Sequence, residues 1–253
     1  VKVISADNEI TLNIVDQLYS SIIKAGTYRA KSIKVAEAAK VIENTQRDVN
    51  IALMNEFANI IDKLGMHWSE VLPSAFTKWN FNKYQPGLVG GHCIGVDPYY
   101  LVHKSKSHGF KPEIISSARK LNEKMPGKIC EFVKYKAKQH GLYPRSCSVL
   151  ILGASFKENV KDIRNSKSID LFKKLSLIFN YVEIYDPIAE AHNKTQNTTI
   201  STEINKKMKF DIIILSVAHD IFSKINPITL ITKKGFVYDI KSFYKRHPKI
   251  YRL

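Results

Sequence analysis

Four short apolar runs in the C-terminal part of the chain constrain its fold more than any other feature. They are residues 148–153, 181–185, 210–216 and 235–239. Runs of this length, bounded by turn-forming residues, are typical of parallel strands buried on both faces. Helical segments are expected between them, at residues 166–179, 203–208 and 227–232. The sequence therefore predicts a doubly wound α/β unit whose ligand binds beyond the carboxyl ends of the strands.

The end of the first predicted strand narrows the kind of ligand. The chain continues there as Gly153-Ala-Ser-Phe-Lys157, which departs from the G-x-G-x-x-G pattern of a dinucleotide site. Lys157 and, further along, Arg164 lie where an anion would be held. We therefore expect an anion site at this edge and no dinucleotide site.

An uninterrupted helical pattern from residue 35 to residue 65 predicts one helix about 45 Å long. One side carries an apolar stripe formed by Val41, Ile42, Val49, Leu53, Phe57, Ile60 and Leu64. Lys40, Asn44 and Asn55 recur along another side. Such polar residues more often form a solvated face. Asparagine is a poor helix former, however, so specific contacts that hold these residues are the alternative.

Residues 87–101 read Gly-Leu-Val-Gly-Gly-His-Cys-Ile-Gly-Val-Asp-Pro-Tyr-Tyr-Leu. The glycines allow a sharp turn that brings a substrate close to backbone amides. A helix beginning near Cys93 would place its thiol in the first turn, where the macrodipole favours a thiolate. Asp97, four residues on, would share that helix face. Cys93 is thus a candidate nucleophile, and a buried structural cysteine is the alternative.

Composition excludes several classes of protein. The formal net charge is +16, but the lysines are scattered and nucleic-acid-binding motifs are absent. We expect a solvated basic surface that can steer an anionic ligand, and no nucleic-acid partner. No run approaches the roughly 18 apolar residues of a membrane span. Three cysteines without metal-type spacing predict a reducing cytoplasm and no metal site.

Four ordered motifs resemble one enzyme family. They lie at residues 34–56, 87–101, 151–166 and 185–187. The match extends over nearly the whole chain, which resembles the UDP-glucose/UDP-mannose-type nucleotide-sugar dehydrogenases. The most similar variant acts on UDP-N-acetylhexosamines and includes the Vi-polysaccharide dehydrogenases. The resemblance implies oxidation of the sugar C6 alcohol to a carboxylate with two NAD⁺, for surface-polysaccharide biosynthesis.

The resemblance also implies roles for individual residues. Cys93 matches the nucleophile that forms a thiohemiacetal and then a thioester, and Asp97 matches the carboxylate that activates the hydrolytic water. Lys40 matches a cation that stabilises the substrate oxyanion, and Asn44 a neutral donor beside it. Residues implied to bind the substrate are Asn82, Lys83, Gly90, Gly91, Phe156 and Lys157. Arg164 matches a phosphate-binding arginine that serves either cofactor or substrate.

The N-terminal part departs from this family. Residues 1–34 give the pattern strand, helix, strand, which looks like the last part of an NAD-binding Rossmann domain whose glycine motif is missing. The expected organisation is therefore a Rossmann remnant at 1–34, a central helical region at 35–140 that dimerises through its long helix, and a UDP-sugar-binding α/β domain at 141–253. We expect the chain to be the C-terminal portion of a nucleotide-sugar dehydrogenase, and we expect this portion not to oxidise the substrate by itself. The alternative is a non-catalytic UDP-sugar-binding and dimerisation module.

Overall fold

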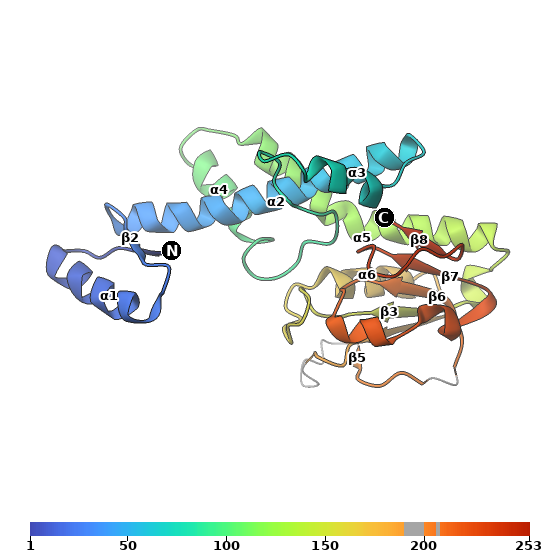
Figure 1. Ribbon diagram of the computed structural model, residues 1–253. Helices are drawn as coiled ribbons and strands as arrows, with labels where there is room; N and C mark the ends of the chain where they lie inside the picture. Colours follow the sequence, from blue (N-terminus) through green and yellow to red (C-terminus); the bar gives the residue numbers. More distant parts are fainter. Residues whose placement is uncertain (190–199, 206–207) are drawn as a thin grey trace.

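The structure is a computed structural model that describes residues 1–189, 200–205 and 208–253. Figure 1 shows a small N-terminal unit at one end, a long helix that leads away from it, and an α/β domain at the other end. The α/β class predicted from the sequence is confirmed.

The α/β domain is built on a sheet whose described strands are all parallel, in the order β5-β4-β3-β6-β7-β8. They are β3 (Ser148–Leu152), β4 (Tyr181–Tyr185), β5 (Ile200–Ser201), β6 (Phe210–Leu215), β7 (Ile231–Asp239) and β8 (Ile250–Arg252). All four strands predicted from apolar runs are present. The short strands β5 and β8 do not coincide with apolar runs of comparable length, so the sequence does not predict them.

The strand order reverses at β3, which pairs with β4 on one side and with β6 on the other. The carboxyl ends of β3 and β6 therefore flank the switch point at which such sheets bind ligands. Helices α5 (Glu113–Gln139) and α6 (Lys167–Ser176) cover one face. The short 3-10 helices η2 (Asp220–Lys224) and η3 (Pro227–Leu230) cover part of the other.

Two of the three helices predicted between the strands need correction. Residues 203–205 and 208 are not helical, and residues 206–207 lie outside the described residues. So short a segment repays little of the cost of nucleating a helix. Residues 227–232 form only the 3-10 turn η3 before β7 begins at Ile231, which pairs with Phe210 of β6. The third prediction, at 166–179, is confirmed by α6.

The long helix is present as α2 (Ile33–Lys63), but its faces are not those expected. Asn44, Asp48 and Asn55 are buried, whereas Ile42 and Leu53 of the apolar stripe are exposed. The polar side is buried because it meets α4 (Asp97–Lys106) and α5. Asp48 accepts hydrogen bonds there from Arg119 (2.5 Å) and Asn122 (2.8 Å) of α5. The solvated-face interpretation is therefore wrong for Asn44 and Asn55, although Lys40 on the same side is exposed.

The N-terminal unit consists of β1 (Lys2–Ile4), α1 (Glu9–Ile22) and β2 (Thr27–Arg29), with the two strands parallel. Asp16 of α1 ties the unit together by accepting hydrogen bonds from Thr27 and from Arg29 Nε (2.7 Å). The strand–helix–strand pattern is as predicted. Its origin in a Rossmann domain and the expected domain boundaries stay predictions.

Candidate functional site

The segment that carries Cys93 forms turns over residues 91–96, and α4 begins only at Asp97. The Cys93 carbonyl accepts hydrogen bonds from the amides of Val96 (3.0 Å) and Asp97 (2.8 Å). The expected helix start near Cys93 is wrong, because Pro98 occupies the first turn of α4, a position that proline favours. The thiol thus lies outside the helix. It is exposed, which excludes a buried structural cysteine.

Asp97 is held by α2. The Asn44 side chain is buried and its Nδ2 donates to Asp97 Oδ2 at 2.6 Å. A short hydrogen bond to a carboxylate is among the stronger contacts available to a neutral side chain. The structure therefore brings together two of the predicted catalytic residues, Asn44 and Asp97, and Asp97 lies four residues after Cys93.

Lys40 lies one turn before Asn44 on α2, at the exposed end of the same face. Its Nζ pairs with Glu43 Oε2 at 2.7 Å, and Glu43 also pairs with Arg47 at 2.9 Å. The Lys40 side chain is 60% exposed, so it is free to turn towards a ligand at the cost of a surface ion pair. Its predicted role stays a prediction.

The other end of the Cys93 segment is also held by α2. Asn55 is completely buried, and its Oδ1 accepts from the Gly87 amide at 2.8 Å while its Nδ2 donates to the Gly87 carbonyl at 3.0 Å. This anchor explains an asparagine inside a helix. The spacing of Asn55 along the polar side of α2 is the signal in the sequence, but its partner cannot be deduced from it.

Gly90 and Gly91 dock this segment onto the α/β domain. The Gly91 amide donates to the carbonyl of Asn165, just before α6, at 3.3 Å. A Cβ at Gly90 would lie 2.6 Å from that same carbonyl oxygen. Gly91 has a φ of +86°, and a Cβ there would lie 2.8 Å from Cδ2 of Phe156. Both positions require glycine, so they set the approach of the segment to Phe156.

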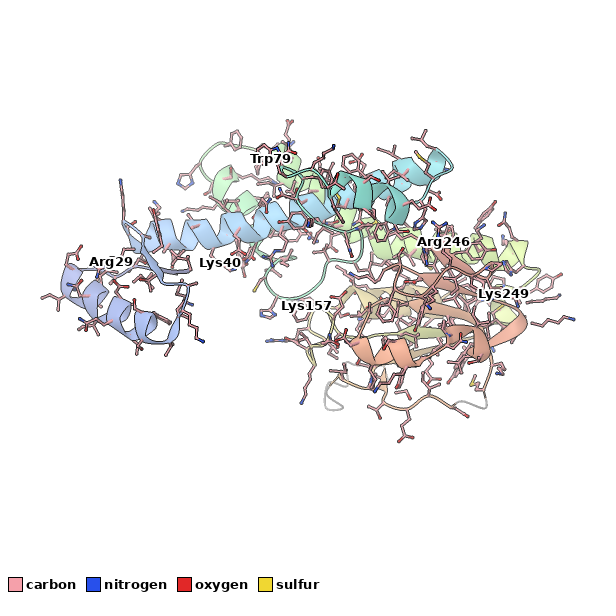
Figure 2. The ribbon with its side chains drawn as sticks, viewed as in Figure 1. Arg29, Lys40, Trp79, Lys157, Arg246 and Lys249 are labelled. Atoms are coloured by element: carbon pink, nitrogen blue, oxygen red, sulfur yellow. The ribbon has the colours of Figure 1, made fainter. Side chains whose placement is uncertain are left out.

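The loop after β3 supplies the predicted residues Phe156 and Lys157 at the carboxyl edge of the sheet. The Phe156 ring packs edge-on against the ring of His92, with centroids 5.9 Å apart. Figure 2 shows Lys157 at the edge of the domain that faces α2. A small cavity of about 60 Å³ opens here, with Gly90, Phe156 and Lys241 among its lining residues.

Lys241 lines this cavity and was not predicted from the sequence. It follows β7 by two residues, and its Nζ pairs with Glu158 at 2.9 Å. A lysine just beyond an apolar run that ends at the ligand edge is the signal that points to it.

Arg164 is exposed and forms a two-pronged ion pair with Asp162, with Nε 3.0 Å and Nη2 2.5 Å from the carboxylate. This hydrogen-bonded pair lowers the pKa of Asp162 to about 2. His92 Nδ1 lies 3.8 Å from the same carboxylate. Arg164 therefore stands close to the Cys93 segment, and its predicted contact with a phosphate requires a change of partner.

Asn82 and Lys83 are exposed in the loop before Gly87. The structure does not bring them into contact with Cys93 or Asp97. Tyr84, the next residue, ties this loop to α2 through a hydrogen bond from its hydroxyl to Gln46 at 3.0 Å. The proposed contact of Asn82 and Lys83 with a sugar stays a prediction.

Two further observations bear on ligands. A wider hollow of about 690 Å³ lies between the end of α2, α5 and β8, and none of the predicted site residues lines it. Within the described residues, we find no cluster of three metal-ligating side chains and no helix long and apolar enough to cross a membrane.

Comparison with known proteins gives two domain matches. Residues 34–124 match the UDP-glucose/GDP-mannose dehydrogenase family, central domain, and residues 150–246 match the UDP binding domain of the same family. The chain is 44% identical to proteins named UDP-N-acetyl-D-glucosamine 6-dehydrogenase from Salmonella typhi and Pseudomonas aeruginosa. Each match covers 95% of this chain, but only 57% and 58% of those relatives.

A solved structure shows the same arrangement. The UDP-D-ManNAc dehydrogenase from Pyrococcus horikoshii superimposes with a TM-score of 0.85 at 26% identity, covering 99% of this chain and 59% of its own. The chain thus spans little more than half the length of the relatives that it matches.

Proposed function

Because the chain belongs to the UDP-glucose/GDP-mannose dehydrogenase family, we propose that it supplies the thiol and the UDP-sugar site of a UDP-N-acetylhexosamine 6-dehydrogenase. The reaction is oxidation of the sugar C6 to a carboxylate, for surface-polysaccharide biosynthesis. The observation that carries the proposal is an exposed Cys93 on a segment that α2 anchors at both ends and that docks beside Phe156.

In this proposal the Cys93 sulfur adds to the C6 aldehyde, forming a C–S bond while the carbonyl oxygen gains a proton. The Lys40 ammonium stabilises the negative charge that develops on this oxygen. Conversion of the thiohemiacetal to a thioester removes two electrons and needs an oxidant that this chain does not supply. Water then adds to the thioester carbonyl, and the C–S bond breaks as the sulfur takes up a proton. Asp97 accepts the proton of that water, and its bond from Asn44 keeps the carboxylate oriented.

NAD⁺ is the oxidant implied by the family, but the described residues do not fit a site for it. A doubly wound sheet holds a pyrophosphate on free amides after a strand. After β3, the amides of Ala154 and Ser155 instead donate to Asp186 at 2.8 and 3.0 Å. The turn after β1, Ser5-Ala-Asp-Asn8, contains no glycine. We therefore derive no hydride transfer from this chain and expect none from it alone.

The substrate's UDP group is proposed to bind at the carboxyl edge of the sheet. Phe156 offers a ring, and Lys157 and Lys241 offer positive charge to the diphosphate. Gly90 and Gly91 keep the Cys93 segment close to this position. Binding here would place the sugar between the α/β domain and the thiol.

We propose, further, a homodimer formed through α2 in a reducing cytoplasm. The exposed apolar residues Ile42, Leu53 and Ile60 support such an interface, since water contact at these side chains is unfavourable. Sedimentation equilibrium of the chain and of Leu53→Glu tests it, because a dimer through α2 should weaken in the variant and a monomeric wild type would exclude it.

The decisive experiment uses the 6-aldehyde of UDP-N-acetylglucosamine, which bypasses the oxidant. The aldehyde should protect Cys93 from iodoacetamide far better than UDP does, since it occupies the sulfur itself. Lys40→Ala should weaken this protection. Equal alkylation with and without the aldehyde would exclude the thiohemiacetal.

A non-catalytic UDP-sugar-binding module is the second candidate, favoured because the described residues do not fit a dinucleotide site. Calorimetry with UDP separates it from the first. Binding of UDP without protection of Cys93 by the aldehyde supports the module, whereas protection supports the enzyme.

A further inference from the structure

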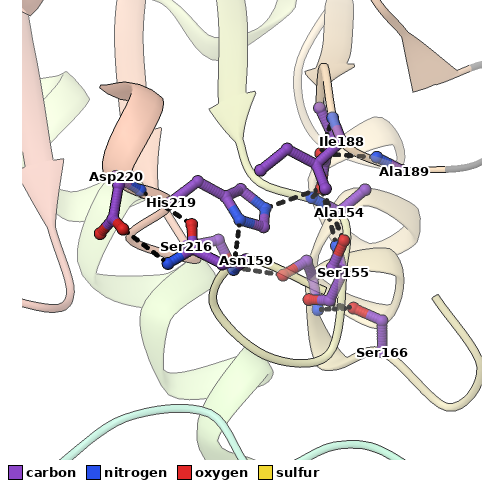
Figure 3. Close-up of polar contacts among 11 residues, drawn as sticks. Ala154, Ser155, Asn159, Ser166, Ile188, Ala189, Ser216, His219 and Asp220 are labelled. Carbon is purple, nitrogen blue, oxygen red and sulfur yellow. Dashed lines mark hydrogen bonds and ion pairs between the residues drawn. The ribbon is translucent and has the colours of Figure 1, made fainter. Parts of the chain in front are cut away.

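Two completely buried, titratable side chains lie behind the loop that carries Phe156 and Lys157. They are Asp186, which follows β4, and His219, which follows β6. Their side chains are joined by a hydrogen bond of 3.0 Å between His219 Nε2 and Asp186 Oδ2. Figure 3 shows His219 between Asn159 and Ala154 of the loop after β3, within a set of polar contacts.

The Asp186 carboxylate accepts from one end of that loop. Its Oδ2 takes hydrogen bonds from the amides of Ala154 (2.8 Å) and Ser155 (3.0 Å) and from the Ser155 hydroxyl (2.9 Å). Its Oδ1 accepts hydrogen bonds from the backbone amides of Ile188 (2.9 Å) and Ala189 (3.0 Å). Burial raises the pKa of Asp186, but His219 and these amides outweigh it and hold the pKa below its usual range. The carboxylate is thus a fixed anion that orients five protein donors besides the imidazole.

His219 holds the other end of the loop. Its Nδ1 accepts from the Asn159 amide at 2.9 Å, so the ring carries its proton on Nε2 and donates it to Asp186. Asn159 has a left-handed φ of +58°, which an asparagine tolerates at a cost. Its side chain also exchanges two hydrogen bonds with Asp220, at 2.9 and 3.1 Å. The loop end is therefore held in a conformation that it would not adopt alone.

The loop has six residues, 154–159, with the anchored residues at its two ends, and it presents Phe156 towards Gly91 and His92. We propose that Asp186 and His219 form a positioning unit that sets loop 154–159 for the nucleotide part of the substrate and, through Phe156, sets the segment that carries Cys93. This proposal rests on the proposed function, in which Phe156 and Lys157 bind the UDP group.

The test compares His219→Gln with His219→Phe. A glutamine Nε2 occupies the place of the imidazole Nε2 and keeps the donor to Asp186, whereas phenylalanine keeps only the ring. UDP affinity by calorimetry should fall about tenfold or more in His219→Phe and less in His219→Gln. Amides 154, 155 and 159 should exchange hydrogen faster in the same order. The matched control is His140→Phe, because both ring nitrogens of His140 are also bonded, to Lys234 and Tyr251, away from the loop.

A merely structural role predicts a different pattern. The melting temperature of His219→Phe would then fall, while its UDP affinity below the melting transition would stay unchanged, as in His140→Phe. That outcome, or wild-type amide protection in loop 154–159 of His219→Phe, would overturn the positioning unit. If His219→Phe does not fold, the same comparison is made with His219→Gln, where unchanged affinity and protection count against the proposal.

The two proposals fail in distinguishable ways. Absence of UDP binding by the wild-type chain contradicts the proposed function, while the exchange rates still decide whether the pair holds the loop. Normal UDP binding in a folded His219→Phe leaves the proposed function intact and removes the positioning unit.

Discussion

Asn55 holds Gly87 by both its backbone groups, accepting from the amide at 2.8 Å and donating to the carbonyl at 3.0 Å. Asn44, three helical turns earlier on nearly the same face of α2, holds Asp97 at 2.6 Å. The two asparagines thus fix both ends of the segment that carries Cys93. Between these ends, Gly90 and Gly91 contact the α/β domain. One helix therefore determines where the thiol lies relative to the sheet.

Asn55→Ala should destabilise the protein by about 3 kcal/mol, because two buried backbone groups of Gly87 lose their partners. Urea unfolding measures the change. The matched control is Asn59→Ala, one turn further on α2, where an exposed side chain donates only to the Asn55 carbonyl. This control should stay within about 0.5 kcal/mol of the wild type. Equal effects of the two substitutions would contradict the anchoring role of Asn55.

Asn44 and Asp97 should be energetically coupled. A double-mutant cycle with Asn44→Ala and Asp97→Ala should give an interaction energy of about 1.5–3 kcal/mol, as expected for a hydrogen bond to a charged group. The same cycle with Asn50→Ala in place of Asn44→Ala serves as control, since Asn50 donates to Gln46 of its own helix. Additive effects for Asn44 and Asp97 would mean that the contact contributes nothing.

The sequence predicts the helices and strands that depend on neighbouring residues. It does not predict contacts between side chains that lie far apart in the chain. The strands at residues 148–153 and 210–216 follow from local apolar runs. The polar side of α2 is also visible locally, but its partner residues, such as Asn122, lie dozens of residues away. Without an acceptor in view, a row of asparagines looks the same whether it meets water or a carboxylate. The family resemblance supplied the predicted catalytic residues, and the structure showed which side chains anchor Asp97 and Gly87.

Iodoacetamide at pH 8 should label one thiol, that of Cys93, which is exposed. Cys130 and Cys147 are buried, and burial raises the pKa of both thiols, to about 11 for Cys147. Their thiolate fractions are therefore small, and reagent access is blocked. Mass spectrometry of the digested protein gives the site, and Cys93→Ser should remove the label. Rapid labelling of Cys147 in the folded protein would contradict the burial.

The Asp162 carboxyl should titrate at about 2, because it is hydrogen-bonded and ion-paired with Arg164. Its lowered pKa means that its contribution to stability is fully present above the ordinary value of about 3.8 and is lost as pH falls towards 2. Arg164→Gln should return the pKa towards 3.8. Carboxyl-carbon NMR titration, with Asp162→Asn to assign the resonance, measures this shift. An unchanged pKa in Arg164→Gln would show that Arg164 does not hold this carboxylate in solution.

Gly91 and Gly109 separate backbone strain from contact with the loop after β3. Both have positive φ, +86° and +79°, so an alanine pays a similar backbone cost of about 1–2 kcal/mol at each. Only at Gly91 does the new Cβ meet a neighbour, the Phe156 ring at 2.8 Å, whereas nothing lies within 4 Å of a Cβ at Gly109.

Gly91→Ala should therefore be the less stable variant by urea unfolding, and it should also bind UDP more weakly, because the ring must move. Gly109→Ala should lose stability while keeping its UDP affinity. If both variants bind UDP as the wild type does, the position of Phe156 does not depend on Gly91, and the segment that carries Cys93 is not coupled to the loop after β3.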